Sequence, residues 1–258
     1  MKIIAVANQK GGAGKTTTAL NLAYGLAAKK KKVLLIDMDG QCNLSFLLGL
    51  DSAEIEESNR NIYQVLREKT SISDCITKTA GALDLIPGSP ALYEADMTIS
   101  KVGKEYKLKK ALENLSGYDF IVIDTCPSLG ILTVNAFTAA DTVVIPVQAE
   151  LLSLLGLRQL SDTLDAVREY CNPALKIDGI LVTRYQGRAR LSKDFHDALA
   201  QQAKALSTRV YPVPIRESVT IKEAQAMRES LFTYAQNAPV TADYQAFIDA
   251  VLKGAKKK

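Results

Sequence analysis

Short apolar runs alternate with longer stretches of helical periodicity along the chain of 258 residues. The first two runs, residues 2–8 and 32–39, are almost continuously apolar, which is typical of strands buried on both faces of a parallel sheet. Five later runs have a similar β-rich character, at residues 82–88, 119–125, 141–148, 177–185 and 207–213. Helical patterns separate the runs, over residues 16–29, 154–170, 191–206 and 242–252. This alternation predicts βαβ units and an α/β fold with a mostly parallel sheet.

The same pattern shows no internal repeat and no linker, and a chain of this length suits one hydrophobic core. We therefore expect residues 1–258 to form a single domain, a twisted sheet with helices on both faces. Residues 51–61 are polar and acidic, which predicts a surface loop. The basic residues at 253–258 are expected to form a flexible tail.

Composition and charge narrow the possible functions. No segment approaches the roughly 20 apolar residues of a membrane span, and the amino terminus lacks the features of a signal peptide, so we expect a cytoplasmic protein. The four cysteines and the one histidine show no metal-ligand spacing, which argues against a zinc or iron–sulfur site within one chain. The net charge of +4 permits nucleic-acid binding without requiring it.

The segment NQKGGAGKTTT, residues 8–18, lies between a predicted strand and a predicted helix. It ends like the phosphate-loop motif G-x-x-x-x-G-K-S/T, although Gln9 occupies the position of the first glycine and a second lysine follows it. Glycines let backbone N–H groups surround phosphate oxygens, and the helix that follows adds the positive end of its dipole. Lys15 should reach the β- and γ-phosphates, and Thr16 should bind Mg²⁺. The predicted nucleotide-binding residues of this loop are Lys10, Gly11, Gly12, Ala13, Gly14, Lys15, Thr16 and Thr17.

Carboxylates end two of the predicted strands. Asp37 and Asp39 end the second strand, and Asp124 follows the apolar run at 119–125. In a parallel sheet this position faces the ligand crevice. Asp124 is therefore expected to hold Mg²⁺ through water, together with Thr16 and Asp39. The alternative for Asp39 is a carboxylate that only caps a turn or a helix.

These segments resemble the ParA/MinD superfamily of ATPases. The loop KGGAGKTT at 10–17 is similar to its deviant Walker A box, and the segments at 33–50, 118–141, 143–160 and 179–188 are similar in order to those of ParA/Soj-type chromosome or plasmid partition ATPases. The resemblance runs from residue 2 to about residue 250. The chain departs from the family pattern at Gly40, Cys42 and Cys126, none of which needs its side chain for phosphate chemistry.

The resemblance implies a P-loop NTPase fold and a Mg²⁺-dependent ATPase that is slow without a partner. ATP would drive a sandwich homodimer that binds DNA non-specifically on the nucleoid, and a ParB-like centromere-binding protein would stimulate hydrolysis to ADP and phosphate. Lys10, Lys15 and Asp39 would be catalytic: Lys10 would touch the phosphates held by the other subunit, and Asp39 would act on the catalytic water. Asp37 would lie close to the metal and the phosphates.

The same resemblance locates the adenine between residues 183–185 and 212–216, with Pro212 and Pro214 as nucleotide-binding residues. Family members bind DNA through basic residues in the C-terminal part. The candidates are Arg184, Arg188, Arg190, Lys193, Arg216 and Lys222. Nothing in the sequence resembles a base-reading helix-turn-helix, so DNA binding should be non-specific. The alternative is a solvated basic face, or cations that serve ATP or dimer contacts.

Two other functions remain open at this point. A MinD-like membrane-associated ATPase would use the helix at 242–252, whose apolar residues fall on one face. We expect this face to pack inside the fold, and we expect no stable membrane association. A redox or metal-handling ATPase would need cysteines that bridge a dimer, and Cys126 by itself does not establish one.

Overall fold

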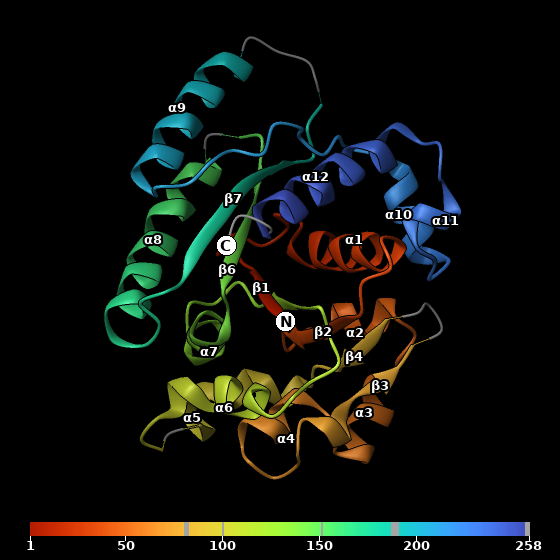
Figure 1. The fold of residues 1–258 in the computed structure, drawn as a ribbon, viewed down its shortest axis with the longest axis vertical. Helices are drawn as coiled ribbons and strands as arrows, with labels where there is room; N and C mark the ends of the chain where they lie inside the picture. Colours follow the sequence, from red (N-terminus) through yellow and green to blue (C-terminus); the bar gives the residue numbers. More distant parts are fainter. Residues whose placement is uncertain (80–82, 100, 151, 187–190, 256–258) are drawn as a thin grey trace.

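A seven-stranded sheet forms the centre of the computed structural model, which describes residues 1–79, 83–99, 101–150, 152–186 and 191–255 (Figure 1). The strand order is β3-β4-β2-β5-β1-β6-β7, and every neighbouring pair is parallel except β3 with β4. This confirms the predicted α/β fold with a mostly parallel sheet. The strands are β1 (Lys2–Val6), β2 (Val33–Met38), β3 (Thr77–Lys78), β4 (Asp84–Ile86), β5 (Phe120–Thr125), β6 (Thr142–Gln148) and β7 (Lys176–Thr183).

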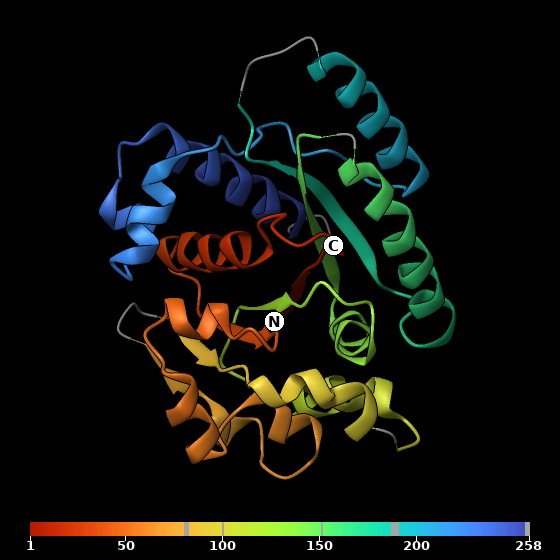
Figure 2. The ribbon, with the colours of Figure 1, turned by 180° about the vertical axis from the view of Figure 1, so that it is seen from behind.

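Helices cover both faces of the sheet (Figures 1 and 2). One face carries α1 (Lys15–Ala28), α2 (Asn43–Leu47), α10 (Val219–Ala226), α11 (Leu231–Tyr234) and α12 (Pro239–Ala255). The other carries α4 (Ile62–Leu66), α6 (Lys107–Glu113), α7 (Ile131–Ala139), α8 (Leu152–Tyr170) and α9 (Leu191–Ala205). Shorter elements are α3 (Ser52–Ser58), α5 (Ala95–Thr98) and the 3-10 turns η1 (Ser73–Cys75), η2 (Pro90–Glu94) and η3 (Lys104–Tyr106).

The central strands are buried along their whole length, as their continuous apolar sequences predict. All six residues of β2 and all six of β5 are buried. Successive residues of β1 face opposite cores: Ile4 and Val6 belong to the core under α1 and α12, and Ala5 belongs to the core under α7 and α8. No helix within the described residues is both long and apolar enough to cross a membrane.

The prediction of a strand at 207–213 was wrong. This segment makes one isolated parallel bridge, between Val210 and Ile180, with hydrogen bonds from the Ile180 amide to Arg209 and from the Tyr211 amide to Ile180. The chain bends at Pro212 and Val213, so this bridge does not extend into a ladder, and hydrogen bonding with β7 resumes only at Ile215, whose amide donates to the Val182 carbonyl at 2.8 Å.

Two other expectations also need correction. Residues 51–61 contain the helix α3 rather than only a loop, because the Asp51 side chain caps it by accepting a hydrogen bond from the Ala53 amide. Only Ile55 of this helix is buried, so apolar periodicity could not reveal it. At the carboxyl terminus α12 continues to Ala255, three residues into the predicted tail, and residues 256–258 lie outside the described part of the chain.

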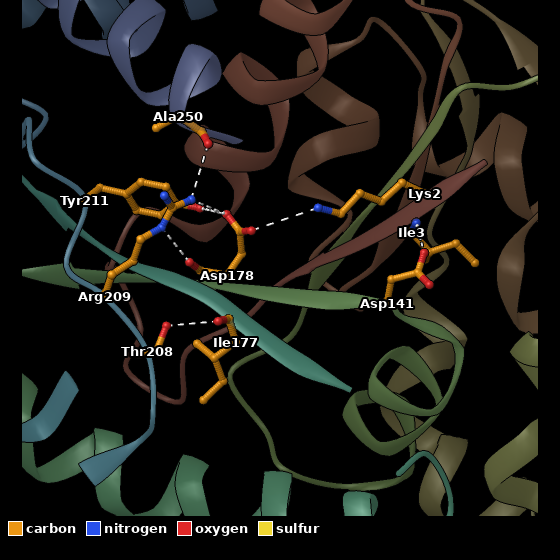
Figure 3. A network of polar contacts seen from close by, with 9 residues as sticks. All are labelled: Lys2, Ile3, Asp141, Ile177, Asp178, Thr208, Arg209, Tyr211 and Ala250. Atoms are coloured by element: carbon orange, nitrogen blue, oxygen red, sulfur yellow. Dashed lines mark hydrogen bonds and ion pairs between the residues drawn. The ribbon is translucent and has the colours of Figure 1, made fainter. Parts of the chain in front are cut away.

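A polar network fastens segments that are distant in sequence (Figure 3). The carboxylate of Asp178 on β7 accepts hydrogen bonds from the Tyr211 hydroxyl and from Arg209 at 3.2 Å, and it lies 3.9 Å from the Lys2 ammonium on β1. Arg209 also donates to the Ala250 carbonyl of α12 at 3.2 Å. The segment that follows α9 is thereby held between β7 and α12, although it is not a strand.

Candidate functional site

A cavity of about 590 Å³ opens at the carboxyl ends of β1, β2 and β5. Its walls come from the glycine loop after β1, the segments that follow β2 and β5, and the η2–α5 region. This is the edge of a parallel sheet where ligands are expected to bind. Gly11, Gly12, Gly14, Lys15, Thr16 and Thr17 of the predicted loop all line it.

The glycine loop has a backbone that few other residues adopt. Gly12 and Gly14 have φ angles of 76° and 88°, in the left-handed region that favours glycine. Gly14 precedes the first turn of α1, which has no side-chain cap, so the N–H groups of that turn are free to bind an anion. The sequence and the geometry therefore agree on a phosphate-binding loop.

Three hydrogen bonds attach this loop to the neighbouring strands. Gln148 at the end of β6 donates to the Gly12 carbonyl at 2.6 Å, and the Thr183 hydroxyl at the end of β7 donates to the Ala13 carbonyl at 2.9 Å. Asn8 donates to the Pro146 carbonyl at 2.6 Å. Sequence reasoning missed the role of Gln148; a polar residue that ends an apolar strand at the ligand edge of the sheet is the signal that could have found it.

The carboxylate of Asp124, at the end of β5, is fully buried, and neither of its oxygens has a hydrogen-bond partner. Burial, and then the charge of Asp37, raise its pKa well above the usual value, while the Thr16 hydroxyl and the Lys15 charge act in the opposite direction. A buried carboxylate without partners requires a cation or a proton. Together with Thr16 and Asp39, which line the cavity, it fits the predicted Mg²⁺ site of Thr16, Asp39 and Asp124.

Lys15 supplies a positive charge that interacts with Asp124 and Asp39. Its side chain is buried and donates to the Lys10 carbonyl at 3.4 Å. Desolvation lowers its pKa, and the charges of Asp124 and Asp39 partly restore it. Negatively charged phosphates would restore it further. Within the described residues no group of three His, Cys, Asp or Glu side chains could hold a metal by itself, so a cation here would also need ligand oxygens.

The two carboxylates of β2 have different positions. Asp39 lines the cavity, and its Oδ1 accepts a hydrogen bond from the Gln41 amide at 3.0 Å. It therefore caps a turn, as the alternative interpretation held, and also faces the ligand space. Asp37 lies beside Asp124 in the β2–β5 register but does not line the cavity. Its Oδ2 accepts two hydrogen bonds from Ser45, so it anchors α2. That it lies close to the metal and the phosphates stays a prediction from the resemblance.

Lys10 lies outside the cavity in this single chain. Its ammonium forms an ion pair with Glu150, in the segment after β6, and the two side chains are 30% and 44% exposed. The Lys10 amide donates to the Asn8 side chain at 2.9 Å. The loop motif predicted a functional role for Lys10, but no spacing rule could have predicted Glu150 as its partner.

Two further cavities lie on the side where adenine was expected, and the smaller one adjoins the loop. The smaller one, about 120 Å³, is lined by Gly14 and Thr17 together with residues from the end of β7, the 215–218 segment and α10. The other, about 720 Å³, is lined by Tyr185 and Pro214 among others. Pro212 is exposed on the turn before Pro214.

The six predicted DNA-binding residues do not form one described surface. Arg184, Arg216 and Lys222 line the cavities beside the phosphate loop. The Arg216 guanidinium binds Asp243 on α12 through two hydrogen bonds, of 2.6 and 2.8 Å. Arg188 and Arg190 lie outside the described residues, as does the side chain of Lys193. The structure therefore places the described members of this group on the nucleotide side.

Comparison with known proteins was made on sequence and on structure. A family model described as an AAA domain matches residues 1–177. The sporulation initiation inhibitor protein Soj of Bacillus subtilis is 39% identical over 236 residues, which are 90% of this chain and 91% of Soj. A Mycobacterium smegmatis structure named cobyrinic acid a,c-diamide synthase, with bound ADP and magnesium, superposes with a TM-score of 0.85 at 33% identity, covering 100% of this chain and 96% of that one. A Borrelia burgdorferi putative plasmid partition protein bound to AMPPNP has a TM-score of 0.78 at 28% identity, covering 98% and 99%.

The burial of Asp37 predicts how stability depends on pH without nucleotide or Mg²⁺. Burial raises the pKa of this carboxyl from 3.8 to about 6, although hydrogen bonds from Ser45 oppose the shift. A raised pKa in the folded state stabilises the protein at low pH, and this stabilisation is lost as the pH rises through about 6. Asp37→Asn removes the titration, so the wild-type free energy of unfolding should fall by about 2 kcal/mol relative to the variant between pH 4 and pH 7. Urea unfolding of both proteins across this range measures it; a difference that does not change with pH would contradict the interpretation.

Proposed function

Because the chain belongs to the ParA/Soj family of partition ATPases, we propose that it hydrolyses ATP to ADP and phosphate and uses bound ATP to form a homodimer that binds DNA. The observation that carries the proposal is the buried Asp124 carboxylate without hydrogen-bond partners, whose charge interacts with that of Lys15 in the glycine loop. The nucleotides bound to the M. smegmatis and B. burgdorferi structures support ATP, and the magnesium in the former supports Mg²⁺.

Each residue of the loop has a distinct task in this proposal. The N–H groups around Gly12 and Gly14 hold phosphate oxygens, and Lys15 neutralises the β- and γ-phosphates. Thr16 and Asp124 hold Mg²⁺, which when bound neutralises phosphate charge and orients the phosphates for attack. Asp39, fixed by its turn with Gln41, orients the attacking water.

The second lysine of the loop supports the dimer. A side chain built on Gly11 would meet nothing within 4 Å, so the loop surface is open to a second copy of the chain. In a face-to-face dimer Lys10 would exchange Glu150 for the phosphates held by the other subunit. Its charge would offset the negative charge that develops during phosphoryl transfer. The Glu150 pair would then oppose dimerisation while the chain is alone.

DNA binding and the partner complete the proposed cycle. The ATP-bound dimer would bind DNA phosphates without sequence preference and so associate with the nucleoid, and a ParB-like protein would stimulate hydrolysis and release it. Arg188, Arg190 and Lys193 are the candidates for this contact. A membrane role through α12 has less support, because Tyr244, Phe247, Ile248 and Val251 are at most 1% exposed and pack in the core with α1.

The nucleotide chemistry can be tested at Asp124. Asp124→Asn should lower the rate of Mg²⁺-dependent phosphate release by about 100-fold or more, since the metal loses its buried anionic partner. The apo variant should unfold no more easily than the wild type, because the mutation removes an unpaired buried charge. Asp119→Asn is the matched control, since Asp119 lies at the opposite, exposed end of the same strand. Hydrolysis by Asp124→Asn at the wild-type rate would exclude the assignment.

The proposed DNA binding is tested by a separate measurement. With ATP, the Asp39→Ala protein should remain ATP-bound and retain a mixed-sequence duplex, and retention should weaken steeply as salt rises. With ADP retention should be lost. Retention by anionic vesicles instead of DNA would favour the membrane ATPase, and retention by neither would leave the ATPase without the partition role.

The Lys10–Glu150 ion pair predicts the effect of a single substitution on assembly. Glu150→Gln should lower the protein concentration needed for the ATP-dependent dimer by about threefold to tenfold, because two exposed ion pairs no longer have to break. Analytical ultracentrifugation with ATP measures this concentration. Glu57→Gln, which changes an exposed acid on α3, is the control. Unchanged assembly of Glu150→Gln would show that the pair does not restrain Lys10.

A further inference from the structure

The position of Arg184 is determined on both sides by contacts to other segments. It follows Thr183, whose hydroxyl donates to the Ala13 carbonyl of the phosphate loop at 2.9 Å. It precedes Tyr185, whose amide donates to the Ile215 carbonyl at 3.0 Å. Arg184 is therefore held between the phosphate loop and the segment that was expected to contact adenine.

The backbone of Arg184 also leaves the direction of the strand. Its φ angle is 50°, in the left-handed region that side-chain-bearing residues rarely adopt. Such conformations persist where surrounding contacts impose them, and they gather at functional sites. The turn occurs at the carboxyl end of β7, which is the ligand edge of the sheet.

Arg184 lines two cavities at once. It lines the 590 Å³ cavity of the phosphate loop and the adjoining cavity of about 120 Å³, and Gly14 and Thr17 are the other residues that line both. In a nucleotide whose β- and γ-phosphates lie in the loop and whose base lies beyond it, this junction corresponds to the α-phosphate and the ribose. The side chain of Arg184 is exposed, and within the described residues it forms no ion pair with a carboxylate.

The other cations near this junction differ from Arg184. Lys15 belongs to the phosphate loop, and the Arg216 guanidinium is held by Asp243. Lys222 lines the smaller cavity from α10, whose Gln225 donates to the Thr17 hydroxyl at 3.3 Å and fixes the helix beside the loop. Arg184 thus lies at the junction itself, and Lys222 lies on the wall beyond it.

We infer that Arg184 is a nucleotide-binding residue that contacts the α-phosphate side of a nucleoside diphosphate or triphosphate, and not a DNA-binding residue. A guanidinium presents several N–H donors in one plane and binds phosphate oxygens in a bidentate manner. This inference rests on the proposed nucleotide site, and it adds a cation from β7 that the loop motif does not contain.

Isothermal titration with Mg²⁺-ADP tests the inference, because ADP isolates binding by one chain from dimerisation. Arg184→Gln should weaken ADP binding by about tenfold, and Arg184→Lys should weaken it less. Arg67→Gln changes an exposed arginine that follows α4 and lines neither cavity, so it should leave ADP affinity unchanged. Equal thermal unfolding midpoints of the apo proteins would show that the fold is retained.

A second measurement separates the two roles of an arginine. At saturating ATP, the double variant Asp39→Ala/Arg184→Gln should bind duplex DNA with the same salt slope as Asp39→Ala alone. The salt slope is the change in the logarithm of the DNA-binding constant with the logarithm of the salt concentration. Unchanged ADP affinity of Arg184→Gln, with a salt slope reduced by about one, would overturn the inference and restore the DNA assignment. If the wild-type protein bound no ADP at all, the proposed function itself would fail, which is a different result from equal binding by wild type and variant.

Discussion

The buried carboxylate of Asp124 is the constraint on which the site depends. It lies at the end of the central strand β5, beside Val6 of β1 and Asp37 of β2 in the sheet register, and neither oxygen is hydrogen-bonded. Leaving a charge of this kind unpaired in a protein interior costs several kcal/mol. The apolar packing of the sheet on both faces holds it there, and a bound cation would remove the penalty. The fold thus holds a buried carboxylate that needs a cation beside the site where the ligand is expected to bind.

The phosphate loop is held in place beside this carboxylate because it is attached to three strands. It continues from β1, and its carbonyls accept hydrogen bonds from Gln148 at the end of β6 and Thr183 at the end of β7. The same attachment determines where the neighbouring cations lie. Lys15 lies close enough to Asp124 for their charges to interact, Lys10 is held aside by Glu150, and Arg184 follows directly after Thr183. One rigid edge of the sheet therefore organises the metal, phosphate and interface positions together.

Sequence patterns predicted the buried strands and the glycine loop, whose chemistry depends on its backbone. Six of the predicted strands exist because continuous apolar runs can only be buried, and the loop from Gly11 to Thr17 was identified because its glycines, lysine and threonine have fixed spacing. The prediction of a strand at 207–213 was wrong because its apolar residues suggested a strand, whereas the chain bends at Pro212 and Val213 after a single bridge. The helix at Ser52–Ser58 was missed because a single apolar residue anchors it.

Contacts between distant segments lay outside the reach of sequence reasoning. Arg184, Arg216 and Lys222 are close in sequence to other basic residues, which favoured a DNA surface, but three-dimensional packing turns them toward the nucleotide cavities. Asp37 lies in β2 and Asp39 directly after it, and Ser45 engages the first while the second lines the cavity. Which carboxylate serves the ligand is decided by α2, whose position only the fold reveals.

We expect Lys10 to complete the site of the other subunit, and a mixture of two inactive variants distinguishes this from action within its own subunit. In a dimer of one Lys10→Ala chain and one Asp39→Ala chain, trans action leaves one complete site, with Asp39 from the first chain and Lys10 from the second. Random pairing would then restore about a quarter of the wild-type rate of ATP hydrolysis, since half of the dimers are mixed and each has one complete site. If Lys10 acted within its own subunit, neither site of the mixed dimer would be complete. Hydrolysis no faster than that of the separate variants would then contradict the account.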